Sequence, residues 1–108
     1  MSVNSYRKGR RNEKKTQAYL EDRGWQVYTA PPGYRINRDI FHKFDHIARK
    51  NRKLKFIQTK TNYISPKHIQ EYFELSMPDN VDVEVWVWKD RAKHPLVYTK
   101  DDKLSTTP

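Results

Sequence analysis

The clearest pattern along the chain is the alternation VDVEVWVW from Val81 to Trp88. Successive side chains of a β-strand point to opposite faces, so a period of two predicts a strand. The valines occupy one face of this strand, and Trp86 and Trp88 share the other. We expect the two tryptophans to pack against a helix or against a partner subunit. Residues 96–100 predict a short edge strand.

Two further apolar stretches predict a β-hairpin. Residues 44–49 (FDHIAR) and 54–61 (LKFIQTKT) flank the polar tetrapeptide KNRK at positions 50–53. The simplest interpretation is two antiparallel strands joined by a four-residue turn. In that register, the numbers of paired residues sum to 103.

The remaining segments predict two helices and one more strand. Residues 6–23 lack proline and are rich in helix formers, and Gly24 follows where a left-handed helix stop is expected. The β-rich stretch WQVYTA at 25–30 runs into a Pro-Pro-Gly loop, and residues 34–43 show no clear period. Ser65 and Pro66 are typical of the start of a helix, which we expect to end near residue 75.

The order of these elements is α, β, β, β, α, β, with one more short strand. It predicts an α/β fold with a mixed central sheet flanked by helices. With 108 residues, the chain suits one small domain, which we place at residues 1–100, followed by a disordered tail at 101–108.

The predicted hairpin brings polar side chains together at one end of a buried stripe. Asp45 is expected opposite Gln58, with Cβ atoms about 4.5–5.5 Å apart, and Lys60 follows on the same face. Ile47 and Phe56 continue that face as an apolar stripe. A buried carboxylate and lysine are costly without partners, so this group predicts a functional site. His46 is expected to point to the opposite face.

Charge indicates a polyanionic partner. Lysine and arginine outnumber the acidic residues by 22 to 13, which gives a net charge of +9 and a pI near 9.8. Cations crowd the N-terminal half of the first helix, although the helix dipole favours the reverse. Phosphate binding explains this placement most simply. The cations are Arg7, Lys8, Arg10, Arg11, Lys14 and Lys15, and Glu13 is the lone acid among them.

Other site types are excluded or disfavoured by composition. The chain has no cysteine, which excludes disulfides and thiolate zinc sites, so that any metal would need oxygen or imidazole ligands. No apolar run approaches the ~20 residues of a membrane-spanning helix, and we expect an intracellular, cytoplasmic protein with no membrane partner. The four histidines lack metal-ligand spacing and are not assigned as ligands: His42, His46, His68 and His94.

Glu13, Asp45 and the run Gln58-Thr59-Lys60 resemble the active-site signature of the PD-(D/E)XK nucleases, which have a restriction-endonuclease-like fold. The small size and the αβββαβ order resemble in particular the archaeal Holliday junction resolvases. The resemblance extends over roughly residues 7–87. Gln58 stands where Asp or Glu is usual, although a Gln variant occurs in the superfamily.

The resemblance implies a metal-dependent DNA endonuclease. Mg²⁺, for which Mn²⁺ would substitute, would be held by Asp45, Gln58, the backbone carbonyl of Thr59 and Glu13. Lys60 would orient the nucleophile and stabilise charge in the transition state. A second acid, Asp39, precedes the hairpin, but Asp45 has the strand context.

The resemblance also implies partners. Branched DNA is the expected substrate, with no small-molecule cofactor, and a homodimer would place two sites on symmetric strands. An exposed tryptophan pair would suit the dimer interface. We expect DNA contacts from residues of the first helix and the following loop, namely Arg7, Lys8, Arg10, Arg11, Lys14, Tyr34 and Arg35.

Two other interpretations stay open at this point. The chain could be another nuclease of the same fold, specific for flaps, ends or a recognition sequence, from a virus or mobile element. It could instead be a non-catalytic nucleic-acid-binding module that kept the fold and the basic face, which Gln58 makes credible. RNA is a weaker candidate, because no RNP-type aromatic motif or GxxG loop is present.

Overall fold

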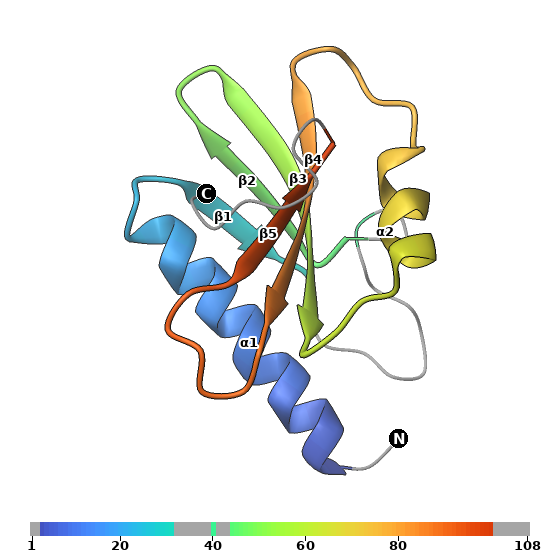
Figure 1. Cartoon of the computed structure of the whole chain (residues 1–108). Coiled ribbons are helices and arrows are strands. Elements are labelled where there is room, and N and C mark those ends of the chain that lie inside the picture. The colour runs from blue at the N-terminus through green and yellow to red at the C-terminus, as the bar shows by residue number, and fades with distance from the viewer. Residues whose placement is uncertain (1–2, 32–39, 41–43, 101–108) are drawn as a thin grey trace.

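The computed structural model describes residues 3–31, 40 and 44–100, with side chains from residue 7 onward. Two helices flank one five-stranded sheet (Figure 1), whose strands lie in the order β1-β2-β3-β4-β5. The β3–β4 pair is parallel and the other pairs are antiparallel, so the sheet is mixed as predicted. The elements are α1 Val3–Glu21, β1 Gln26–Thr29, β2 His46–Lys50, β3 Lys53–Thr61, α2 Pro66–Phe73, β4 Val81–Trp88 and β5 Leu96–Thr99.

Helix α1 begins three residues earlier and ends two residues earlier than the sequence predicts. Gly24 adopts φ +90°, and the backbone N–H of Trp25 donates to the carbonyl of Leu20 at 3.1 Å, which closes the helix end. A left-handed residue costs glycine little because it lacks a Cβ atom. The chain can therefore turn directly into β1.

The hairpin of β2 and β3 has the predicted register but a shorter turn. His46 pairs with Ile57 and Lys50 with Lys53, so the paired numbers sum to 103. The predicted four-residue turn is wrong, because the ladder continues until only two residues connect the strands. Asn51 has φ +55°, a conformation that asparagine adopts more readily than most residues and that two-residue hairpins favour. The register is unaffected, because shortening a turn symmetrically leaves the pairing sum unchanged.

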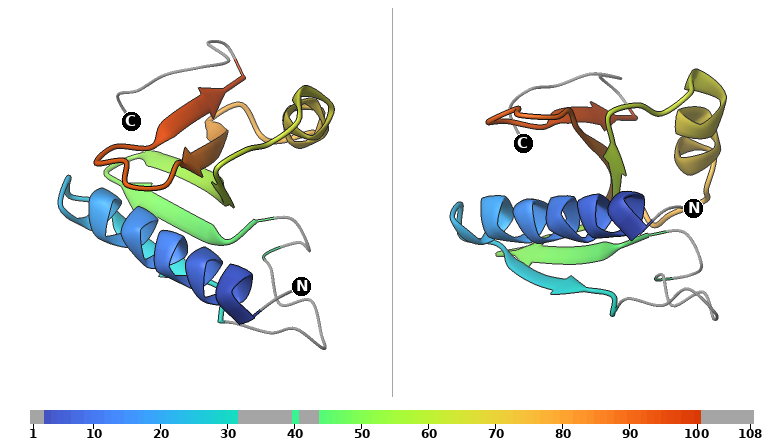
Figure 2. Two further views of the ribbon diagram at one scale, coloured as in Figure 1. Left: turned by 60° about the horizontal axis from the view of Figure 1, so that its bottom comes forward. Right: turned by 90° about the horizontal axis from the view of Figure 1, so that it is seen from below.

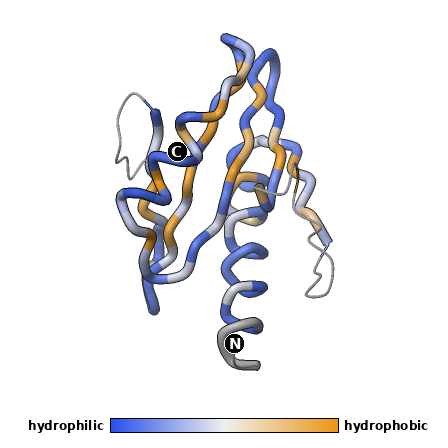
Figure 3. Tube along the Cα trace, turned by 90° about the vertical axis from the view of Figure 1, so that its right-hand side faces the viewer, coloured by the Kyte–Doolittle hydropathy of each residue, from blue (hydrophilic) through white to orange (hydrophobic). Residues whose placement is uncertain are grey.

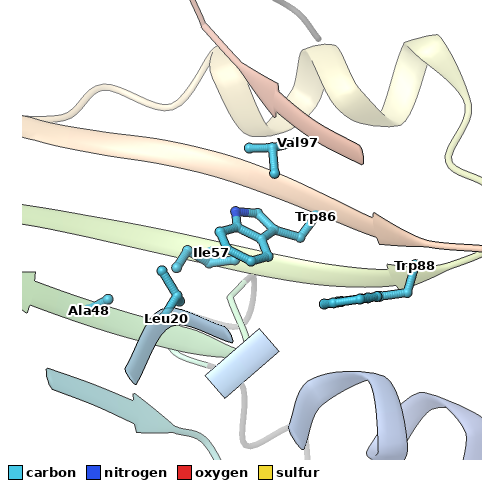
Figure 4. Close-up of a cluster of buried hydrophobic side chains, with 6 residues drawn as sticks. All are labelled: Leu20, Ala48, Ile57, Trp86, Trp88 and Val97. Carbon is cyan, nitrogen blue, oxygen red and sulfur yellow. The ribbon is translucent and has the colours of Figure 1, made fainter. Parts of the chain in front are cut away.

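The two helices cover opposite faces of the sheet. Helix α1 packs on the face that carries Trp86 and Trp88, and both side chains lie in a core cluster with Leu20 and Ile57 (Figure 4). The predicted packing of these tryptophans against a helix is confirmed. The expected exposure of the pair is wrong, since Trp86 is 0% and Trp88 is 3% exposed. They therefore cannot form a dimer interface.

Helix α2 packs on the valine face, where Tyr72 and Phe73 join clusters around Phe56 and Val85. Hydrophobic positions concentrate along the strands, whereas α1 is mainly hydrophilic (Figure 3). Within the described ranges, no helix is long and apolar enough to cross a membrane.

Candidate active site

Asp45 lies directly before β2, and its backbone continues the pairing with β3. Its N–H donates to the carbonyl of Ile57 at 3.0 Å. The carboxylate is 6% exposed, and its Oδ2 accepts a hydrogen bond from the backbone N–H of Thr59 at 3.0 Å. The side chain of Asp45 therefore reaches across to the strand that carries Gln58 and Lys60, as the predicted register requires.

Gln58 supplies an uncompensated oxygen at this position. The residue is 7% exposed, and its Oε1 is buried without a hydrogen-bond partner. Within the described residues, its Nε2 makes one long hydrogen bond, of 3.5 Å, to the carbonyl of Thr59. A buried acceptor left unpaired costs about 1–3 kcal/mol. An oxygen that tolerates this cost beside a carboxylate and a backbone carbonyl fits a hard cation, which prefers such ligands.

Lys60 follows Gln58 on the same face of β3, because the two residues are two positions apart. It is half-buried and pairs in register with Val87 of β4. Within the described part of the chain, the side chain of Lys60 forms no ion pair or hydrogen bond. Its three N–H donors therefore remain available to an anionic ligand near Gln58.

Glu13 lies on the side of α1 that faces β1. Four residues later on the same side, Gln17 accepts a hydrogen bond from the Thr29 hydroxyl at 2.7 Å. Glu13 itself forms an ion pair with Arg10, with Nη1 and Oε1 2.6 Å apart. The described residues contain no group of three or more His, Cys, Asp or Glu side chains arranged for a metal. The oxygen donors that the structure brings together are those of Asp45, Gln58 and Thr59.

Behind the site, a buried network of hydrogen bonds holds Thr59 from the α1 side. The Thr59 hydroxyl lies 2.8 Å from Thr16 Oγ1 and 2.8 Å from His46 Nε2. His46 Nδ1 lies 2.8 Å from the Thr29 hydroxyl, and Trp88 Nε1 donates to Thr16 at 2.8 Å. The network thus joins α1 to four strands.

His46 is the titratable member of this network. It points away from the Asp45 face, as predicted, and is 0% exposed. Burial and, to a smaller extent, the positive charge of Arg10 lower its pKa from 6.5 to about 4. The imidazole is therefore neutral at pH 7, with one nitrogen donating and the other accepting.

Sequence reasoning missed this network. The signal was a set of polar residues at inward-facing positions, in particular Thr59 and Thr61 alternating with Gln58 and Lys60 on β3, and Asn12 and Thr16 one turn apart on α1. Asn12 Nδ2 donates to Thr61 Oγ1 at 2.9 Å and completes this helix–sheet contact.

The predicted DNA contacts on α1 fall into two groups. Lys8 pairs with Asp90, with Nζ and Oδ1 3.1 Å apart, and Arg10 pairs with Glu13. Arg7, Arg11 and Lys14 are exposed and form no ion pair within the described residues. Their spacing of four and three residues places them in one outward stripe. The N-terminal end of α1 extends past the strand ends (Figure 1). Asn12 and Thr16 contact β3, so Arg11 and Lys14 lie on the part of α1 beside the sheet.

The loop between β1 and β2 carries several of the predictions made from sequence. Tyr34, Arg35, Asp39 and His42 lie outside the described residues. The predictions that Tyr34 and Arg35 contact DNA, and that Asp39 is only a rival acid, therefore stay predictions. His68 and His94 are exposed, and His94 Nδ1 lies 3.2 Å from the Tyr19 hydroxyl.

The fold defined by these elements is α/β and restriction-endonuclease-like, as predicted. The structure is similar to that of Hjc, a Holliday junction resolvase from the archaeal hyperthermophile Archaeoglobus fulgidus, with a TM-score of 0.63. The match covers 89% of this chain and 84% of that chain at 15% sequence identity. No family model and no curated protein match the sequence. The predicted resemblance to archaeal resolvases is therefore confirmed at the level of the fold.

Proposed function

We propose that this protein is a metal-dependent DNA endonuclease and, more specifically, a Holliday junction resolvase. One observation carries the proposal. In a resolvase-like fold, the buried Asp45 carboxylate, the unpaired Gln58 oxygen and the Thr59 backbone meet at adjacent strand positions, and Lys60 follows on the same face. Purely structural packing would leave neither a buried oxygen unpaired nor a lysine uncompensated beside it.

Asp45, Gln58 and the Thr59 carbonyl would hold Mg²⁺, with Mn²⁺ as a substitute, and Glu13 would contribute directly or through water. When bound, the ion would act as a Lewis acid at the scissile phosphate and lower the pKa of a bound water. The Thr59 N–H keeps the Asp45 carboxylate oriented. Two carboxylates and one amide carry two formal negative charges, so we expect weaker metal binding than at an all-carboxylate site.

Lys60 supplies the positive charge that the chain itself brings to the reaction. Its ammonium group can donate to a non-bridging phosphate oxygen and to the attacking water. Such contacts strengthen as negative charge develops in the transition state. Arg7, Arg11 and Lys14 would bind neighbouring phosphates, which adds affinity without sequence information.

Cutting a four-way junction on symmetric strands requires two active sites. We therefore propose a homodimer that binds branched DNA. Its interface must lie outside Trp86 and Trp88, because α1 and the sheet already bury them.

The proposal is tested by cleavage of labelled four-way junction, flap, linear duplex and single-stranded DNA in Mg²⁺, Mn²⁺ or EDTA. The wild type is compared with Asp45→Asn and Lys60→Ala. Lys67→Ala, which removes an exposed lysine on α2, is the matched control. We expect paired symmetric cuts in the junction alone, a loss of at least about 100-fold in both site variants, and an unchanged control. If both site variants cut the junction at the wild-type rate, the assignment of Asp45 and Lys60 to the active site is refuted.

Gln58 specifically favours a second candidate, a non-catalytic DNA-binding module, because the amide replaces a charged ligand. Equal binding of the junction by the wild type and both site variants, with no cleavage in any divalent ion, would support that function. Cleavage of flaps, ends or a sequence, abolished in the same two variants, would keep the nuclease site and change the substrate.

A further inference from the structure

The sheet face that carries Asp45 and Gln58 is only partly covered. Helix α2 packs over its β3–β5 half, and within the described residues no helix covers its β1–β2 half, on the side away from α1 (Figure 2, right). We call this half the open sheet face. It holds a shallow groove of about 270 Å³, whose lining includes Gln26, Tyr28, Ile47, Arg49 and Leu54.

Tyr28 stands out on the open sheet face because it is 57% exposed despite its large apolar ring. It pairs in register with Ile47. Asp45 lies two residues before Ile47, directly before β2, and its backbone continues the pairing with the β1 side through Ala30, which makes Tyr28 and Asp45 diagonal neighbours on one face. Such neighbours are about 7–8 Å apart. The Tyr28 ring is therefore within one nucleotide of a phosphate held at Asp45.

The charge of the open sheet face suits a polyanion. Arg49 is the charged residue among the described residues of the groove lining, and Arg52 follows in the exposed turn between β2 and β3. Among the described residues, the lining contains no acidic side chain. By contrast, a second groove at the start of β4 is lined by acidic side chains, among them Asp79 and Asp82.

We propose that the open sheet face binds the nucleic-acid strand beside the scissile phosphate, with the Tyr28 ring stacked on an adjacent base. This inference rests on the proposed function and names its substrate class. Bases inside a continuous duplex present only their edges, whereas bases at a branch point or in a single strand can expose a π-face. The site is thus matched to DNA with an unstacked nucleotide next to the cut.

The test is DNA binding in EDTA, measured by fluorescence anisotropy with four-way junctions that carry 2-aminopurine near the crossover. Tyr28→Ala should weaken binding about 5- to 100-fold and reduce the quenching of 2-aminopurine. Tyr28→Phe keeps the ring and should bind within about twofold of the wild type. Tyr63→Ala is the matched control, because Tyr63 is also exposed, at 70%, but lies after β3 beside α2.

Wild-type affinity and quenching in Tyr28→Ala would overturn the inference, as would a Phe variant as weak as the Ala variant. Sedimentation of each variant adds a second criterion. A shift of Tyr28→Ala from dimer to monomer would assign the open sheet face to a second copy of the chain instead. Because no metal is present, the test is separate from catalysis. Binding that depends on Tyr28, without cleavage, would refute the nuclease function and support the stacking role. Cleavage, with binding that does not depend on Tyr28, would support the nuclease function and refute the stacking role.

Discussion

Gln58 is the residue on which the chemistry of the site depends most. Its side-chain oxygen is buried and unpaired, next to a carboxylate that is held in place by Thr59. A glutamine there avoids the cost of burying a second charge when no cation is bound. It also gives up the Coulombic attraction that a carboxylate would offer to a cation. The residue thus trades metal affinity for stability of the metal-free protein.

Replacing Gln58 with Glu should retain or tighten Mg²⁺ binding, with a gain on the order of tenfold, because a charge replaces a dipole in a buried position. The metal-free variant should melt at a lower temperature than the wild type, since the new carboxylate is desolvated, and Mg²⁺ should reverse this loss. Titration calorimetry and thermal denaturation measure both effects.

Gln70→Glu makes the same change of charge at an exposed position of α2 and should leave Mg²⁺ affinity unchanged. A clear loss of Mg²⁺ affinity in Gln58→Glu would contradict the role of this residue as a ligand.

At the scale of elements, the contact between α1 and the sheet is unusual because much of it is polar. Asn12, Thr16 and His46 are at most 4% exposed and are hydrogen-bonded to strand residues or to one another through Thr59. Hydrogen bonds are directional, so they define the position of α1 along β3 more sharply than apolar contacts would. This polar contact holds Thr59, whose backbone reaches both Asp45 and Gln58, from behind.

The lowered pKa of His46 predicts a specific loss of stability in acid. Between pH 6.5 and about pH 4 the unfolded chain protonates this histidine and the folded chain does not. The unfolded state therefore binds more protons, and stability falls as the pH falls. A shift to about 4 corresponds to a total of about 3 kcal/mol, at 1.36 kcal/mol per pKa unit.

Urea denaturation of the wild type and His46→Gln at several pH values isolates this contribution from the carboxylates. The stability advantage of the wild type should shrink across the window from pH 6.5 to 4. The exposed His68, changed to Gln, should show no such dependence. A constant difference between wild type and His46→Gln over that window would refute the assignment.

At the scale of the whole molecule, the positive charge is unevenly engaged. Some cations are neutralised internally, such as Lys8 with Asp90 and Lys55 with Glu84, the latter pair being nearly buried. Within the described residues, no acidic side chain neutralises the outward stripe of Arg7, Arg11 and Lys14. The net charge of the chain is +9. This charge thus runs along the outward side of α1, whose N-terminal end extends past the strands (Figure 1).

Changing Arg7, Arg11 and Lys14 together to Gln should weaken DNA binding at low salt and flatten its salt dependence. For every phosphate that the triple variant no longer neutralises, the slope of log K against log salt should fall by about 0.9. Binding of duplex and junction over a range of NaCl concentrations measures this slope. Lys53, Lys67 and Lys100, which are all exposed and lie on β3, on α2 and after β5, form the control triple. Equal weakening in the control triple would mean that net charge, and not the stripe, drives binding.

Local patterns in the sequence were sufficient for the order of elements, the hairpin register and the pairing of Asp45 with the strand that carries Gln58. Side-chain alternation and the symmetry of a hairpin decide these features, and neither depends on distant parts of the chain. The turn length was not predictable in the same way, because a two-residue turn and a four-residue turn give the same hairpin register. The identity of the residue at Asn51 decided in favour of the tighter turn.

By itself, therefore, the sequence determined which side chains share a strand face, since a period of two is a local property of the backbone. Only the tertiary structure decided what covers each face. It buried Trp86 and Trp88 beneath α1, joined His46 to Thr59 and Thr16, and left Tyr28 open beside Asp45. These outcomes depend on contacts between segments tens of residues apart, which no local pattern encodes.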